Sequence, residues 1–462
     1  MSTSNIFYSN QLDTVSINEK QLPILYDVDA VIVGGSFAGI SLAKNLAENG
    51  KTVAIVESRT YLGREVSATL RPWVINQANR NDVPEIMREI INRGEQKNDE
   101  IALYIDQVKT HLEDVVLDKG VSLLYASYPT GLYTEESGDK LLVIGNKSGR
   151  QIVRAKVIID TTETASVLHL AGENFESNVT SNRSYWKTIE FYRTDGLTDH
   201  SLDVPEYIGV DGHTVHLHQG YLENGHVFLE FKVTMDNIVK GTTLDRVMSD
   251  EIASRHTMMK LSEYLIQNHP AFKNAYLAAS SFELQPTNFK RLIGSVDHSF
   301  DQIVEVADDN KFSLLDFAST DPRLWCVNES ARDSRIAELL INPLIASSLG
   351  EKLAEQLNQV WDKIVQTAVT ANESKRKMET IEGNNSFTVR EQDVPEQGRS
   401  YQKEIVPDQD IPVLYQTDVL VVGGGTSGAT AAITSAKEGM DTVLLEMNPG
   451  LGLVGLNMLG FY

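Results

Sequence analysis

An apolar run at Ala30–Val33 stops at two glycines, and apolar residues then recur at helical spacing over Ile40–Asn49. A second apolar run, Val53–Val56, ends in the acidic residue Glu57. Short unbroken apolar runs bounded by turn residues predict buried parallel strands, and the three- and four-residue spacing between them predicts a helix. We therefore expect a strand–helix–strand unit near the N-terminus.

The turn between the first strand and the helix has the spacing of a dinucleotide-binding loop. It runs through Gly34, Gly35, Ser36, Phe37, Ala38 and Gly39. Gly34 permits the tight turn, the amides at the helix start face a pyrophosphate, and Gly39 lets the helix approach the strand closely. Glu57 is placed to accept hydrogen bonds from ribose hydroxyls, which disfavours NADP. An incidental glycine turn in another α/β fold is the alternative.

Alternating and apolar segments extend the expected sheet. Val121–Tyr125 predicts a third parallel strand. Gly131–Thr134, Lys140–Gly145 and Gln151–Ala155 alternate apolar and polar residues, which predicts an antiparallel meander. The chain then returns to the sheet at Val157–Asp160.

Helical patterns flank these strands. Residues 82–118 have an apolar stripe that predicts a long amphipathic helical region, and Leu244–Gln267 predicts a single long helix within a mixed α/β stretch. Leu324–Val327 predicts a strand, and Ile341–Leu357 predicts an apolar helix.

Composition narrows the class of protein. A length of 462 residues suggests two or three domains, and a formal charge of −23 argues against nucleic acid or an anionic membrane surface as a partner. The single cysteine, Cys326, excludes an intrachain disulfide and the paired cysteines of a disulfide reductase. No apolar run has membrane-spanning length and the N-terminus has no signal-peptide pattern, so we expect a cytoplasmic protein.

The residues that follow Glu57 extend the dinucleotide-binding pattern and point to a particular protein family. They include Ser58, Arg59, Gly63 and Arg64. The stretch Asp29–Arg64 resembles the extended dinucleotide signature of FAD-dependent oxidoreductases of the glutathione-reductase and fumarate-reductase type. Ala155–Gly172, in which Asp160 ends a strand, is similar to a second element of that family that lies close to FAD. The resemblance implies FAD as cofactor, bound by the loop residues, Glu57, the residues after it and Asp160.

Several positions depart from the family pattern. Ser36 replaces the second glycine, and Glu163 replaces a glycine in the turn after Asp160, where an acid would repel a diphosphate. Only Lys290–Arg291 is kept from an arginine-rich motif, and Asn328–Glu329 replaces the usual residues near the ribityl chain. These departures favour an alternative in which the chain is a non-catalytic, partly degenerate flavoprotein half that braces a catalytic partner.

Residues 411–462 align without gaps on residues 22–73, which indicates an internal duplication. The second copy has the complete glycine pattern and the strand-terminal acid, and we expect FAD contacts from Gly423, Gly425, Thr426, Ser427, Gly428 and Glu446. Half a nucleotide-binding domain cannot bury its own sheet. We therefore expect the second copy to be truncated and completed by a second polypeptide, through natural cleavage, a separate subunit or a truncated gene product.

The expected fold is α/β, with a Rossmann-like FAD-binding domain, an antiparallel meander, an inserted mixed α/β substrate domain and the start of a second Rossmann-like unit. The expected ranges are an arm (1–24), the FAD-binding domain (25–180 and 321–367), the substrate or cap domain (181–320), a linker (368–410) and the second unit (411–462).

The expected function is hydride transfer to or from a small organic substrate, with the flavin carrying the redox chemistry. Arg64, Arg71 and Arg291 are the candidates for charge stabilisation, and the sequence identifies neither a general base nor the substrate. His213, His216 and His218 could suggest a metal site, but no carboxylate or cysteine cluster accompanies them, and we expect no metal. A dehydrogenase that uses only a nicotinamide cofactor fits the meander and the Gly63–Arg64 pair poorly.

Overall fold

The computed structural model describes residues 14–17, 20–75, 83–176, 183–197, 200–223, 225–235, 243–296, 298–306, 310–367, 403–406, 409–448 and 450–452. These residues form two compact units. Those between 20 and 235 and between 248 and 406 belong to the larger unit, and those between 409 and 452 belong to the smaller unit together with residues 14–17 and 243–247. Much of the expected arm and most of the expected linker lie outside the described residues. The expected domain boundaries stay predictions.

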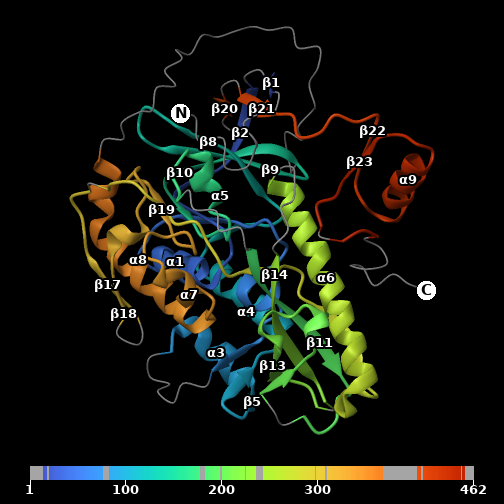
Figure 1. The fold of residues 1–462 in the computed structure, drawn as a ribbon. Coiled ribbons are helices and arrows are strands. Elements are labelled where there is room, and N and C mark those ends of the chain that lie inside the picture. The colour runs from blue at the N-terminus through green and yellow to red at the C-terminus, as the bar shows by residue number, and fades with distance from the viewer. Residues whose placement is uncertain are drawn as a thin grey trace. The chain divides into compact units, whose positions relative to one another are not determined.

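The larger unit is built on an eight-stranded sheet (Figure 1). Its strands are β2 (Lys20–Val33), β3 (Val53–Val56), β7 (Ser122–Leu124), β8 (Tyr128–Thr134), β9 (Lys140–Asn146), β10 (Gly149–Asp160), β19 (Leu324–Cys326) and β20 (Lys403–Val406). β7, β3, β2, β10 and β19 run parallel to one another, so the mixed α/β class and the third parallel strand are confirmed. β8, β9 and the first half of β10 form the antiparallel meander.

One strand differs from the expectation. The last meander strand and the returning parallel strand are a single strand, β10, which pairs antiparallel with β9 over Gly149–Ala155 and parallel with β19 over Ile158–Asp160. Lys156 is the exposed residue at the point where its partner on that side changes. The polar break in the sequence pattern marks this change of partner, not an end of the strand.

Helices pack on this sheet and bury its apolar residues. They are α1 (Phe37–Glu48), α2 (Arg64–Ser67), α3 (Glu85–Arg93), α4 (Ile105–Leu117), α5 (Ser166–Leu170), α7 (Arg335–Leu340) and α8 (Pro343–Gln366). α1 and α8 lie side by side (Figure 1), and a Cβ on Gly350 would lie 2.2 Å from the carbonyl oxygen of Ala38. The absence of a side chain at Gly350 allows this close packing.

The region expected to be one long amphipathic helical layer is divided. Between α3 and α4 the chain forms a hairpin of β5 (Glu95–Lys97) and β6 (Glu100–Ala102), and β6 pairs with β4 (Trp73–Ile75). Gly94 ends α3 with extended backbone, and Asn98 takes the left-handed conformation of a tight turn, with φ of 51°. The expectation of a continuous helical region over 82–118 was therefore wrong for residues 95–102.

A second sheet with its own core covers residues 183–286. It contains β11 (Arg183–Tyr192), β12 (Ser201–Asp203), β13 (Thr214–Gln219), β14 (Val227–Met235), β15 (Tyr276–Ser280) and β16 (Gln285–Pro286). The helix α6 (Thr243–Asn268) confirms the expected long helix and buries Leu261 and Leu265 against this sheet. A two-stranded hairpin of β17 (Ile303–Val306) and β18 (Asn310–Ser313) and short 3₁₀ turns at Glu206–Ile208, Asp211–His213, Pro270–Phe272 and Leu314–Phe317 complete the larger unit.

The smaller unit repeats the strand–helix–strand arrangement of residues 29–57. β22 (Val419–Val422), α9 (Thr426–Lys437) and β23 (Thr442–Leu445) follow one another, and the two strands pair in parallel. β1 (Thr14–Ile17) and β21 (Gln409–Pro412) form a separate antiparallel pair. In the described part of the chain, no helix is long and apolar enough to span a membrane.

The two copies differ most in burial. Val33 at the end of β2 is 1% exposed, whereas its counterpart Val422 is 78% exposed. In the first copy, β10 pairs with β2 on the side away from β3, and this pairing includes Val31 and Val33. The described residues place no such strand beside β22, whose sheet has two strands.

Candidate dinucleotide site

The carboxyl ends of the parallel strands converge at the loop after β2. The Thr161 amide, directly after β10, donates to the carbonyl of Val33 at 2.8 Å, and the Thr161 hydroxyl lies 2.6 Å from the carbonyl oxygen of Gly34. Gly34 has φ of 103°, and a Cβ there would lie 2.7 Å from the backbone of Thr161. This edge of an open parallel sheet is where ligands bind in α/β folds.

Glu57, at the end of β3, makes its hydrogen bonds within the chain. Its Oε2 accepts from the amide of Gly35 at 2.5 Å, and its Oε1 accepts from the Ser58 hydroxyl at 3.0 Å. The backbone amide and the Nη1 of Arg59 also donate to Oε1, at 2.7 and 3.0 Å. The side chain is about 1% exposed. The carboxylate that the sequence assigns to a ribose is therefore surrounded by donors from its own chain.

The start of α1 is also occupied by side chains of the protein. Ser36 caps the helix by accepting from the amide of Gly39 at 3.1 Å. Glu65 on α2 accepts from the amide of Phe37 with both oxygens, at 3.1 and 3.3 Å. Burial raises the pKa of the Glu65 carboxyl to about 7. Sequence analysis did not identify Glu65, because nothing in its local pattern shows that α2 folds back on the loop.

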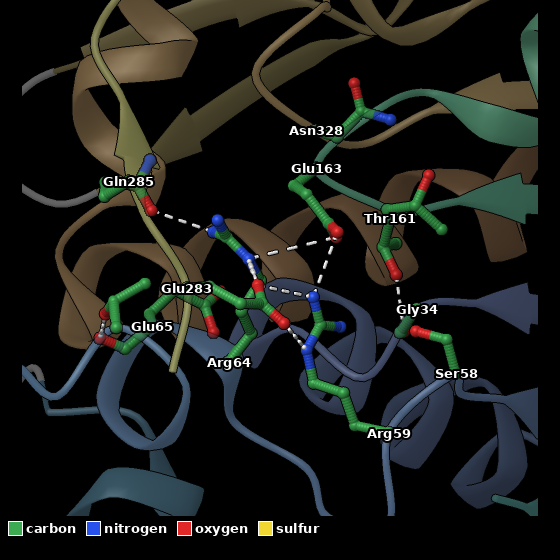
Figure 2. A network of polar contacts seen from close by, with 12 residues as sticks. Gly34, Ser58, Arg59, Arg64, Glu65, Thr161, Glu163, Glu283, Gln285 and Asn328 are labelled. Atoms are coloured by element: carbon green, nitrogen blue, oxygen red, sulfur yellow. Dashed lines mark hydrogen bonds and ion pairs between the residues drawn. The ribbon is translucent and has the colours of Figure 1, made fainter. Parts of the chain in front are cut away.

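Two arginines and two glutamates form a network beside this loop, which we call the Arg–Glu network: Arg59, Arg64, Glu163 and Glu283 (Figure 2). Arg59 donates to both oxygens of Glu283 at 2.6 and 2.7 Å and to Glu163 at 3.0 Å. Arg64 donates from Nε to Glu283 at 3.0 Å. Desolvation opposes ionisation of Glu163, but the two guanidinium groups lower its pKa to about 2.

Glu283 reaches the network from the chain that leads into β16. The next residue but one, Gln285, accepts from Nη1 of Arg64 at 2.8 Å (Figure 2). Arg64 is only 5% exposed, so its charge is satisfied by buried and half-buried groups of the protein. No sequence pattern identified Glu283, which lies 224 residues from Arg59.

The space left at the centre of this site is small. A hollow of about 10 Å³ is lined by residues of the loop, the network and the ends of β10 and β19, including Ser36, Thr161 and Asn328. That volume holds about one water molecule, whereas sites for organic ligands and cofactors measure roughly 300–1,000 Å³. This hollow is therefore far smaller than such a site.

The other predicted site residues of the larger unit lie apart from one another. Asp160 is fully buried, and its Oδ2 accepts from the amides of Val167 and Leu168 at the start of α5. Arg71 forms an ion pair with Glu230 at 2.5 Å. Arg291 forms an ion pair with Glu176. The catalytic candidates are thus paired in three different places, and their role stays a prediction.

The histidines of β13 do not form a metal site in the structure. His218 stacks on Trp73 at 3.7 Å between ring centroids, and its Nδ1 lies 2.9 Å from a carboxylate oxygen of Glu100. Among the described residues, no group of three or more His, Cys, Asp or Glu side chains is arranged to hold a metal ion. His218 instead links the second sheet to the three-stranded sheet of β4, β6 and β5.

The smaller unit has the same loop geometry. The Gly424 amide donates to Glu446 Oε2 at 2.5 Å, as Gly35 does to Glu57. The Gly452 amide donates to the Gly424 carbonyl at 2.8 Å, as Gly63 does to Gly35. Gly423 has φ of 98°.

Among the described residues, no side chain covers the start of α9, unlike the start of α1. Gly425 is the N-cap of α9 and has no side-chain cap, and no described atom lies within 4 Å of a Cβ placed on it. The positions that correspond to Arg59 and Glu65 in the aligned sequences are Asn448 and Val454. Gly423, Thr426, Ser427 and Gly428 surround this helix start, so the second copy presents its amides without an acidic side chain of the described residues bonded to them.

Comparison with solved structures finds similar proteins at low sequence identity and with TM-scores below 0.5. A geranylgeranyl bacteriochlorophyll reductase-like protein from Thermoplasma acidophilum is 15% identical, with a TM-score of 0.44, over 74% of this chain and 82% of that one. The p-nitrophenol 4-monooxygenase of Pseudomonas putida DLL-E4 is 13% identical, with a TM-score of 0.47, over 75% and 84%. L-proline dehydrogenase from P. horikoshii is 13% identical, with a TM-score of 0.40, over 73% and 94%.

No curated protein matches the sequence significantly. A family model does match it. The model of the FAD-dependent oxidoreductases covers residues 29–291 and 418–455, which is well over half of the 462 residues and includes both glycine-rich loops. This chain therefore belongs to the FAD-dependent oxidoreductase family, and FAD is its cofactor.

Proposed function

We propose that the chain is part of an FAD-dependent oxidoreductase that transfers a hydride to or from a carbon centre of a small organic substrate. The observation that carries this proposal is the family match, which spans both dinucleotide loops. When bound, FAD supplies the redox chemistry, while the protein binds, orients and shields the reacting groups.

The residues of the second copy support cofactor binding in a simple way. Glu446 is held at the end of β23 by the amides of Gly424 and Asn448, at 2.5 and 2.8 Å, which fixes its carboxylate beside the loop. A carboxylate at this position can accept hydrogen bonds from ribose hydroxyls. The open amides at the start of α9 can receive a diphosphate.

We also propose that the chain is duplicated and that a second polypeptide completes the second copy. The first copy shows what is required: β7 and β10 flank β3 and β2, and α8 packs on α1. In the second copy, the large apolar side chains Leu420, Val422 and Leu445 are 55%, 78% and 45% exposed. Parallel sheets are normally buried on both faces. The completing polypeptide would supply the equivalents of β7, β10, β19 and α8.

A second candidate function is that of a non-catalytic flavoprotein half that braces a catalytic partner. The filled site of the first copy favours it for that half, because the hollow there has a volume of about 10 Å³. The two candidates differ in whether this chain contributes contacts to a flavin that takes part in turnover.

An anaerobic reduction experiment separates the two. The purified native protein is mixed with a panel of alcohols, hydroxy acids and amines without oxygen, and the flavin absorption is followed. Bleaching by one donor, and its loss in Glu446→Ala, supports hydride transfer with contacts from this chain. Bleaching that is unchanged in Glu446→Ala supports the bracing role.

A further inference from the structure

We infer that the first dinucleotide cradle of this chain is permanently filled by its own carboxylates and arginines, and that FAD is held by the second copy. The first cradle consists of the loop at residues 34–39, the start of α1 and Glu57. The inference rests on the proposed function, since it assigns the cofactor of that function to one of the two copies. It makes the first copy a structural domain that has kept the shape of a nucleotide-binding fold.

A carboxyl group of the protein already lies at the start of α1. Amides at a helix start attract anions, and in a dinucleotide cradle that anion is the pyrophosphate. Here the carboxyl group of Glu65 takes that place, with both oxygens within 3.3 Å of the Phe37 amide nitrogen. Glu65 is 7% exposed, so its position is enclosed by the protein. A diphosphate at the same place would have to displace Glu65 and would be repelled by its ionised form.

The two arginines beside the loop are paired with glutamates of the same chain. Arg59 and Arg64 follow the acid-ended strand, where cationic side chains could contact a diphosphate. Glu283 accepts from both of them, and Glu163 also accepts from Arg59 (Figure 2). Glu163 therefore acts as a partner of the arginines. The Arg–Glu network leaves neither guanidinium free to bind phosphate without breaking an ion pair.

The Arg–Glu network is also connected to the second sheet. Glu283 precedes β16, which pairs with β11. Arg64 also contacts this segment through Gln285, at 2.8 Å. The Arg–Glu network thus ties the nucleotide-binding sheet to the second sheet across the position of the cofactor. A flavin in the first cradle would require these contacts to open together.

The second copy has different residues at the positions compared. The aligned positions of Ser36, Arg59 and Glu65 are Gly425, Asn448 and Val454, so the second copy has neither an arginine nor a glutamate at these three positions. It keeps the strand-terminal acid, Glu446, in the same hydrogen bond to the loop. The family match includes this segment as well. The second copy has the cradle without the groups that fill it.

A matched pair of substitutions tests the inference on the full-length native protein. Ser36→Asp and Gly425→Asp each place a carboxylate at the N-cap of the helix after the loop, where Asp stabilises a helix. Neither strains the backbone, since both residues have negative φ. FAD is released by denaturation and measured by chromatography per mole of chain, and its dissociation constant is measured by adding FAD to protein stripped of flavin.

We expect Ser36→Asp to keep the wild-type FAD content and Gly425→Asp to weaken FAD binding by at least about tenfold, since an added carboxylate faces the diphosphate. Ser36→Asn and Gly425→Asn add a side chain of the same size without the charge, and FAD should bind more weakly to Gly425→Asp than to Gly425→Asn. Loss of FAD in Ser36→Asp, or full retention in Gly425→Asp, overturns the inference while leaving the proposed function intact. A wild-type protein that neither contains nor binds FAD refutes the proposed function itself.

Discussion

Glu65 bonds to the amide of Phe37 through both carboxylate oxygens, although 28 residues separate the two in sequence. The contact places a carboxyl group at the start of α1, where a bound dinucleotide would place its phosphates. The second copy has Val454 at the aligned position. Two loops with the same backbone geometry therefore differ in the acidic residue that follows them in sequence.

The buried Glu65 carboxyl makes stability depend on pH. Its pKa is raised by burial from 4.5 to about 7, so between these values the folded protein holds a proton that the unfolded chain has released. The free energy of unfolding should therefore fall as the pH rises from about 5 to 7, by at most about 3 kcal/mol from this group. Glu65→Gln removes the titrating group and should flatten this dependence.

Thermal unfolding at pH 5 and pH 8 measures the difference. The wild type should lose more stability than Glu65→Gln over this interval. Asp160, whose pKa burial raises to about 6, contributes with the same sign in both proteins and so cancels in the comparison. Parallel pH profiles for the two proteins would show that Glu65 is not buried as described.

The Arg–Glu network should respond to substitution as one coupled group. Arg59→Met leaves the carboxylates of Glu57, Glu163 and Glu283 without their shared partner and should lower the free energy of unfolding by roughly 3 kcal/mol. This is the low end for a buried ion pair, because Glu163 and Glu283 are 25% and 22% exposed.

Adding Glu163→Gln to Arg59→Met should cost less than the sum of the two single changes, because it removes one of the unpaired charges. Urea unfolding of the wild type, both single variants and the double variant gives the coupling free energy. Additive effects would mean that Arg59 and Glu163 do not interact in solution. Lys352→Ala, on the solvent side of α8, serves as a control for the loss of a surface cation.

The contact between α1 and α8 predicts that one methyl group added at Gly350 lowers the stability of the fold. Gly350→Ala would bring a Cβ to 2.2 Å from the Ala38 carbonyl oxygen, so the two helices must move apart. We expect a loss of about 1–3 kcal/mol in the free energy of unfolding. Glu355→Ala, on the exposed face of the same helix, should stay within about 0.5 kcal/mol. Equal urea midpoints for Gly350→Ala and the wild type would contradict the packing described.

The exposed apolar residues of the second copy predict an association. Native mass spectrometry of protein purified from its natural source should find this chain bound to a further polypeptide that continues the flavoprotein pattern. Val422→Asp should abolish that association, because Val422 lies on β22 where the first copy pairs with β10. Thr430→Asp, on the exposed part of α9, is the control. A folded wild-type preparation of the 462-residue chain alone, with slow hydrogen exchange in β22, would contradict the proposal.

Local pattern was sufficient to predict the strands that end at Val33 and Val56, the long helix α6 and the antiparallel meander. In these segments the periodicity of buried positions is the same as the periodicity of the element. The hairpin at residues 95–102 was missed, because its strands have three residues each and its residues are largely polar.

The candidate site was predictable only in part. Glycine spacing and Glu57 identified the cradle, and Glu163 was recognised as an acid in an unfavourable place. Its role as a partner of Arg59 was not predictable, since the two lie 104 residues apart and meet only when β3 and β10 are in one sheet. Glu65 and Glu283 reach the site through tertiary packing, which sequence periodicity does not describe.

The number of cradles that bind FAD can be counted from the FAD that the native protein releases per chain, determined by denaturation, chromatography and protein quantification. With one filled cradle and one open cradle, we expect one equivalent of FAD for each 462-residue chain. Two equivalents would show that the first cradle opens to bind cofactor despite the Arg–Glu network. The absence of FAD, or a nicotinamide dinucleotide in its place, would contradict the assignment as a whole.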